Sequence, residues 1–94
     1  MAAKIEKIHE YLEIGINAHQ AGNLRDAEKN YRKVLKIDHA NSDALNLLGV
    51  ISFQNGNFEK AKDLIKKAIQ NNSQNAGYYN NLGQALQNLG ETNA

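Results

Sequence analysis

Apolar residues recur along the chain with the period of amphipathic helices. Between residues 4 and 21 the apolar residues are Ile5, Ile8, Leu12, Ile14, Ala18 and Ala21, mostly three or four apart. Similar stripes predict helices at about 24–37, 41–55, 58–71 and 75–90. Gly22-Asn23 and Gly56-Asn57 separate the first helix from the second and the third from the fourth. Because a two-residue connection keeps its helices side by side, each joined pair is expected to be an antiparallel hairpin.

The pattern repeats with a period of 34 residues. Gly15, Gly49 and Gly83 fall at equivalent positions. So do Tyr11, Leu45 and Tyr79; Ile14, Leu48 and Leu82; Gly22, Gly56 and Gly90; and Ala27 and Ala61. A fixed period in this range is typical of repeat architectures. We therefore expect one domain over residues 1–94, with a first repeat at about 8–41, a second at 42–75 and a half repeat at 76–94.

These positions resemble the tetratricopeptide repeat, a helix–turn–helix unit of 34 residues. The resemblance implies an all-α superhelix, or solenoid, of antiparallel hairpins with five helices. It also implies that Gly15, Gly49 and Gly83 allow close approach of a neighbouring helix, with Ala27 and Ala61 on the facing side. The sequence lacks the family's tryptophan and its repeat-ending proline, which His39 and Ser73 replace. Thr92 occupies the place of Leu24 and Phe58, so the third repeat is expected to stop before its second helix.

Composition narrows the possible functions. The formal net charge is only +1, from 11 basic and 10 acidic residues, so no global field favours nucleic acid or an anionic membrane. Cysteine is absent, which excludes disulfides and thiol catalysis. No apolar run approaches the roughly 20 residues that span a bilayer, and the first ten residues lack the apolar core of a signal peptide. We expect a cytoplasmic protein that binds neither nucleic acid nor membrane.

The resemblance places ligand binding on the concave face, which the first helix of each repeat lines. The residues expected there are His9, Leu12, Glu13, Ile16, His19, Asp43, Asn46, Leu47, Val50, Phe53, Gln54, Asn80, Asn81, Gln84, Gln87 and Asn88. This set is apolar at one end and rich in amides at the other, which suits a peptide or helix of a protein partner. The alternative is that Leu47, Val50 and Phe53 pack between adjacent repeats and contact no ligand.

Catalysis and cofactor binding are not expected. His9 and His19 are about 15 Å apart along a helix, so one metal ion cannot bridge them. His9 and Glu13 are one turn apart, but an open surface lacks the enclosed pocket that acid–base chemistry needs. The family's clamp for a terminal carboxylate needs lysine, arginine and asparagine side chains where this chain has Leu12, Ile16, Leu47, Gly77 and Asn81. Only Asn81 fits, and no cation faces the groove to meet an anion. The basic second helices lack interleaved aromatic residues for base stacking.

Two further functions remain open. The stretch Tyr79-Asn80-Asn81-Leu82-Gly83 resembles the repeats that precede protein O-glycosyltransferases, where a row of asparagines binds peptide backbones. The resemblance implies a substrate-handling arm of a bacterial glycosyltransferase, with Asn81 in the row and Leu47 interrupting it. The other function is self-assembly into a homo-oligomer through the C-terminal helix, whose uncovered edge would consist of Tyr79, Leu82, Leu86 and Leu89.

Overall fold

The computed structural model describes residues 2–90 and forms five helices in that range. They are α1 (Ala2–Gln20), α2 (Leu24–Ile37), α3 (Ser42–Gln54), α4 (Phe58–Asn71) and α5 (Ala76–Asn88). Residues 2–90 contain no strand, which confirms the expected all-α fold with five helices. Met1 and the last four residues of the predicted half repeat, 91–94, lie outside the described residues.

Asparagine side chains start four of the five helices. The side-chain oxygens of Asn23, Asn41 and Asn57 each accept a hydrogen bond from the backbone N–H three residues later, while that of Asn75 accepts from the N–H of Gly77. Such caps satisfy N–H groups that have no partner inside the helix. At the preceding helix ends, Gly22 and Gly56 both adopt a φ of +82°, which glycine reaches without strain. The same Gly-Asn pair therefore ends one helix and begins the next.

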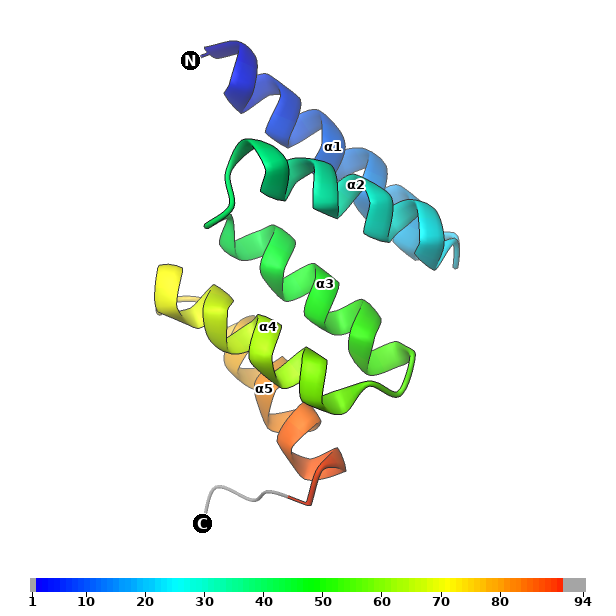
Figure 1. Ribbon diagram of the computed structural model, residues 1–94, viewed down its shortest axis with the longest axis vertical. Coiled ribbons are helices and arrows are strands. Elements are labelled where there is room, and N and C mark those ends of the chain that lie inside the picture. The colour runs from blue at the N-terminus through cyan, green and yellow to red at the C-terminus, as the bar shows by residue number, and fades with distance from the viewer. Residues whose placement is uncertain (1, 91–94) are drawn as a thin grey trace.

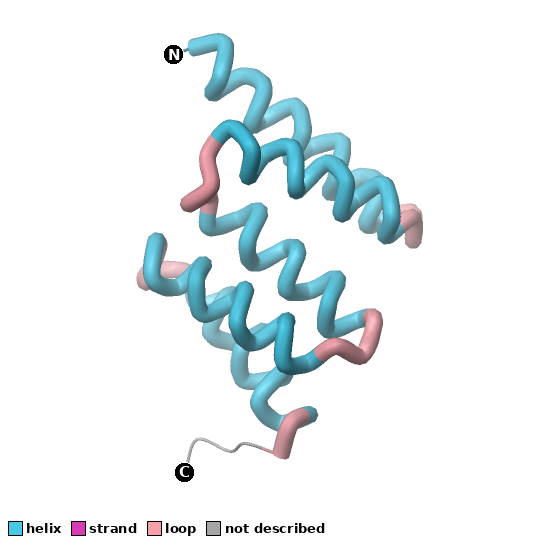
Figure 2. Tube along the Cα trace, in the orientation of Figure 1, coloured by secondary structure: helices cyan, strands magenta, loops and turns pink. Residues whose placement is uncertain are grey.

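The helices stack as hairpins along one axis (Figure 1). α1 packs on α2, α3 packs on α4, and α5 packs on α4, while the contact of α2 with α3 joins the two repeats. The molecule is elongated, 44 by 27 by 18 Å, with α1 and α5 at opposite ends of its long axis. Figure 2 shows that a short turn joins the helices within each hairpin.

Two apolar clusters form the core, and each spans a junction between helices. The first contains Ala27, Tyr31, Val34, Ala44, Leu48 and Ile51, and the second contains Leu45, Ala61, Ile65, Ala68, Tyr78 and Ala85. Both clusters combine the second helix of one repeat with the first helix of the next. The core is therefore continuous between repeats, as expected for a solenoid.

The repeated glycines differ in what they contact. A methyl group at Gly15 would lie 2.5 Å from a ring carbon of Tyr31, and one at Gly49 would lie 2.6 Å from Cγ1 of Ile65. The backbone oxygen of Ala61 would be 3.3 Å from the same methyl group at Gly49. The expected close helix approach is thus confirmed at the first two positions. It is wrong for Gly83, because within residues 2–90 no second helix follows α5 and nothing lies within 4 Å of an added methyl group.

Candidate functional site

A hollow of about 310 Å³ crosses the face formed by α1, α3 and α5. We call it the inner groove. Its lining residues are Leu12, Ile16, Asp43, Asn46, Leu47, Asn75, Gly77, Tyr78 and Asn81. Six of these were expected at the binding face from the sequence: Leu12, Ile16, Asp43, Asn46, Leu47 and Asn81. The first helices of three successive repeats thus contribute to one hollow.

Three side-chain hydrogen bonds join the first helices of adjacent repeats, and we call them the polar seam. His19 Nε2 lies 2.7 Å from Gln54 Oε1, Asn81 Nδ2 donates to Asn46 Oδ1 at 3.1 Å, and the Tyr78 hydroxyl donates to Asp43 Oδ1. Each pair is separated by 35 residues, one more than the repeat. Several side chains predicted to bind a partner are therefore also engaged in holding the repeats together.

Tyr78 is the main member of this site that the sequence did not indicate. Its side chain is 3% exposed, and burial raises the pKa of the hydroxyl to about 12, with the hydrogen bond and charge of Asp43 as further causes. Tyr78 is therefore neutral at physiological pH and holds the exposed carboxylate of Asp43 at the edge of the groove. The equivalent positions in the earlier repeats hold Glu10 and Ala44, so the repeat pattern carries no signal for a tyrosine.

The side chain of His19 connects α1 to two other helices through hydrogen bonds. Its Nδ1 lies 3.1 Å from the hydroxyl of Tyr31 on α2, and its Nε2 lies 2.7 Å from Oε1 of Gln54 on α3. Because a carboxamide oxygen only accepts, Nε2 carries the proton in this arrangement and Nδ1 accepts from Tyr31. Tyr31 is fully buried against Gly15, and burial raises its pKa to about 12. His19 thus fixes the orientation of a core residue.

The apolar residues predicted for the binding face are partly used in packing. Leu47 packs against the first core cluster, and Phe53 packs against the second and meets the ring of Phe58 at 5.1 Å between centroids. Val50, Phe53 and Gln84 border a smaller hollow of about 40 Å³ beside Asn81. Leu47 and Phe53 therefore pack between repeats, as the alternative stated, and each also borders one of the two hollows.

The remaining predicted binding residues are not brought into either hollow. His9, Glu13, Asn80, Gln87 and Asn88 are exposed on α1 and α5. Asn88 donates a hydrogen bond to the carbonyl of Gln84 in its own helix. Of the amides predicted on α5, Asn81 and Gln84 line these two hollows.

One of the four residues predicted to form an exposed edge on α5 is buried in the structure. Tyr79 is 48% exposed, and its hydroxyl donates to the carbonyl of Ser73, while Leu82 and Leu89 are half-buried. Leu86 is only 8% exposed and does not belong to an exposed edge. It takes the place of Ser52 in the second repeat, which is also buried, so this position faces the protein interior in both helices.

Residues 2–90 hold no group of three histidine, cysteine or acidic side chains placed to bind a metal ion. No helix within that range is long and apolar enough to cross a membrane.

Stacked antiparallel hairpins with a groove across their first helices define a helical repeat protein. A family model for the tetratricopeptide repeat matches residues 18–86. The chain belongs to the tetratricopeptide repeat family, and this membership indicates protein–protein interaction.

Among similar curated proteins, the UDP-N-acetylglucosamine–peptide N-acetylglucosaminyltransferase of Caenorhabditis elegans is 35% identical over 92% of this chain, which spans 8% of that enzyme. The photosystem I assembly protein Ycf3 of Prochlorococcus marinus is 27% identical over 95% of the chain, which spans 53% of Ycf3. The type IV pilus assembly protein PilF of Pseudomonas aeruginosa is 33% identical over 81% of the chain, which spans 30% of PilF.

A solved structure shares the fold. A mutant O-GlcNAc transferase of Thermobaculum terrenum matches with a TM-score of 0.87 and 31% sequence identity, over 88% of this chain and 16% of that one. The match confirms the helical superhelix expected from the repeat. The chain thus spans about half or less of each of these relatives.

Proposed function

We propose that this protein is a non-catalytic scaffold that binds an extended peptide segment of a partner in the inner groove. One observation carries the proposal: the groove places apolar side chains and paired amides side by side. Leu12, Ile16 and Leu47 supply an apolar wall, and Asn46 and Asn81 supply the amides. A volume of about 310 Å³ suits one or two side chains and the backbone between them, which favours an extended segment over a whole helix.

The asparagine pair matches the hydrogen-bonding groups of one peptide unit. Asn81 Nδ2 donates to Asn46 Oδ1, which leaves Nδ2 of Asn46 as a donor and Oδ1 of Asn81 as an acceptor. Neither of these two atoms has a protein partner among the described residues. A bound peptide would donate its N–H to Asn81 and accept from Asn46 through its C=O.

The charge at the groove restricts the ligand further. Asp43 is exposed at its edge, and no lysine or arginine lines it. An acidic segment would therefore be repelled by Asp43. It would also find no cation to replace the hydrogen bonds that its carboxylates make to water. The expected ligand is a neutral or basic segment with a leucine-sized apolar side chain.

The experiment is a peptide array followed by fluorescence polarisation of the best binders. Asn81→Ala removes one donor and one acceptor, so Kd should rise about ten-fold, as expected for the loss of one or two hydrogen bonds. Asn80→Ala is the matched control, because Asn80 is adjacent, exposed and outside the groove. Its Kd should remain within about two-fold of the original. Equal effects of both substitutions, or the absence of any binder below millimolar concentration, would refute the proposal.

The similarity to two sugar transferases favours a more specific form of this function. In that form the inner groove holds the acceptor polypeptide of an enzyme whose catalytic part lies elsewhere. The same array distinguishes the two if it includes peptides that the Thermobaculum terrenum enzyme modifies. Binding of these peptides with the same dependence on Asn81 supports the transferase arm, whereas binding confined to unrelated sequences supports a general scaffold.

A further inference from the structure

Most of the positive charge lies on the two second helices. α2 and α4 carry nine of the 11 basic residues of the chain: Arg25, Lys29, Arg32, Lys33, Lys36, Lys60, Lys62, Lys66 and Lys67. They carry only four of the 10 acidic residues: Asp26, Glu28, Glu59 and Asp63. These helices therefore hold an excess of five positive charges, and the rest of the chain holds an excess of four negative ones, giving the overall +1. The small net charge conceals a strong separation of charge within the fold.

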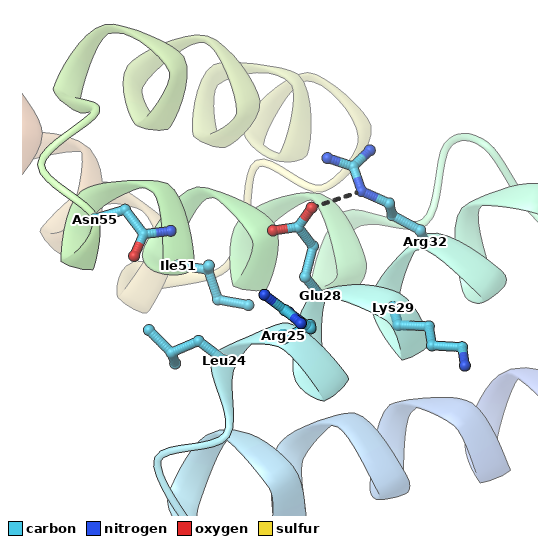
Figure 3. Close-up of a pocket in the computed structure, with 7 residues that line it drawn as sticks. All are labelled: Leu24, Arg25, Glu28, Lys29, Arg32, Ile51 and Asn55. Carbon is cyan, nitrogen blue, oxygen red and sulfur yellow. Dashed lines mark hydrogen bonds and ion pairs between the residues drawn. The ribbon is translucent and has the colours of Figure 1, made fainter.

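Three of the five cations of α2 border a hollow of about 640 Å³ between α2 and α3, which we call the outer hollow (Figure 3). Its lining residues are Leu24, Arg25, Glu28, Lys29 and Arg32 of α2, Ile51 of α3, and Asn55, which caps the C-terminal end of α3. It shares no lining residue with the inner groove. Leu24 and Ile51 provide an apolar floor, and the charged side chains form the rim.

The rim has an unbalanced positive charge. Arg32 pairs with Glu28 through an Nε–Oε2 contact of 3.0 Å, which Figure 3 shows as a dashed line. Arg25 and Lys29 have no acidic partner among the described residues. Figure 3 places Arg25 beside Leu24 and Ile51, while Lys29 extends away from Ile51. The hollow thus combines an apolar floor with two cations that lack a counter-charge.

The second repeat shows that the fold does not require these cations. Shifted by 34 residues, the lining positions of the outer hollow become Phe58, Glu59, Lys62, Asp63, Lys66, Ala85 and Leu89. Arg25 is replaced by Glu59 and Lys29 by Asp63, so the sign of both charges is reversed. The equivalent positions in the second repeat are neutral overall, whereas the outer hollow has an excess of two positive charges.

We propose that the outer hollow is a second docking site, which binds an acidic segment of a protein that carries one apolar side chain. The apolar side chain would lie on Leu24 and Ile51, and carboxylates would bind Arg25, whose planar guanidinium matches their geometry, and Lys29. None of the lining residues is aromatic, so a nucleic acid would find phosphate contacts but no surface for base stacking. Charge separates the two sites: the inner groove excludes an acidic ligand, and the outer hollow selects one.

The test uses a fluorescein-labelled peptide of about twelve residues, composed of glutamate and aspartate with one central leucine. The variant Arg25→Glu/Lys29→Asp places the second repeat's residues in the first repeat. It should fold and should weaken binding at least ten-fold, because rim attractions become repulsions. The matched control, Lys60→Glu/Lys67→Asp, makes the same change in net charge at exposed positions outside the hollow. Its Kd should stay within about three-fold.

Changes in the probe complete the test. Replacing the peptide's leucine with serine should weaken binding, and replacing its acids with glutamine should abolish it. Thermal melting by circular dichroism checks folding, and Arg25→Gln/Lys29→Gln serves as a milder variant should the first fail to fold. The proposal is overturned if both charge reversals weaken binding equally or if the acidic peptide does not bind. It is also overturned if an oligouridylate or an anionic lipid vesicle binds more tightly with the same dependence on Arg25.

Discussion

The glycines at equivalent positions of α3 and α5 provide a direct test of how closely the repeats are packed. Alanine favours the helix over glycine by about 1 kcal/mol. At Gly83 an added methyl group meets nothing within 4 Å, so Gly83→Ala should raise the free energy of unfolding by up to about 1 kcal/mol. At Gly49 the same methyl group lies 2.6 Å from Cγ1 of Ile65 and 3.3 Å from the backbone oxygen of Ala61.

The overlap at Gly49 cannot be relieved by a small side-chain movement. Ile65 is 1% exposed, and Cγ1 is close to its backbone, so relief requires the two helices to separate. Overpacking of this kind costs about 1–3 kcal/mol. Since the helix-propensity gain is common to both variants, the difference between Gly49→Ala and Gly83→Ala should be about 1–3 kcal/mol. For a domain of this size that corresponds to a lower Tm by at least about 4 °C.

Urea unfolding followed by circular dichroism at 222 nm measures both variants against the original protein. The slope of free energy against urea should be unchanged, which would show that the same surface is exposed on unfolding. Equal stabilisation by both substitutions would refute the reasoning, because it would mean that α3 and α4 do not meet closely at Gly49.

Two further predictions concern buried hydroxyl groups and helix caps. The pKa values of Tyr31 and Tyr78 are raised from 10 to about 12, so above pH 10 the unfolded chain releases protons that the folded protein retains. The free energy of unfolding should therefore fall between about pH 10 and 12. The urea midpoint of the variant Tyr31→Phe/Tyr78→Phe should fall less steeply over this range than that of the original protein. Equal slopes of urea midpoint against pH in the two proteins would contradict the prediction. Asn57→Ala should lower the free energy of unfolding by about 1 kcal/mol through loss of the bond to the N–H of Lys60, whereas Asn57→Ser should retain most of it. Equal loss in both variants, measured by urea unfolding, would show that the cap contributes nothing.

The fold was predictable because its signals are local and repeated. Gly22 and Gly56 end helices, asparagines begin them, and the 34-residue period aligns the buried positions. The cap of α3 is Asn41, which lies at the predicted start of that helix. Leu86 was predicted to lie on the exposed edge because it is an apolar residue in a helix without a partner. The prediction is wrong, since both Leu86 and its equivalent in the second repeat, Ser52, are buried.

The candidate site was less predictable, because its interactions depend on pairs of residues far apart in the sequence. Asn46, Leu47 and Asn81 could be assigned to the groove from their offset to the repeated glycines. The bonds of Tyr78 to Asp43 and of His19 to Tyr31 could not, because these partners lie at positions where the repeats differ. Likewise, Arg25 and Glu59 occupy equivalent positions of the repeat, so the period alone does not distinguish them. The difference in their charge becomes informative once the structure places Arg25 at the outer hollow.

The polar seam gives the array a direction. In two of its three bonds, His19 with Gln54 and Asp43 with Tyr78, the side chain in the earlier repeat differs chemically from its partner 35 positions later, so these bonds form in only one order of the repeats. The third bond joins two asparagines, Asn46 and Asn81. If the two repeats were exchanged, Phe53 would meet Gln20 where His19 now meets Gln54, and that bond would be lost. The hairpins therefore share one shape but are not interchangeable modules, and a designer who shuffles them must also transplant the complementary half of every seam contact.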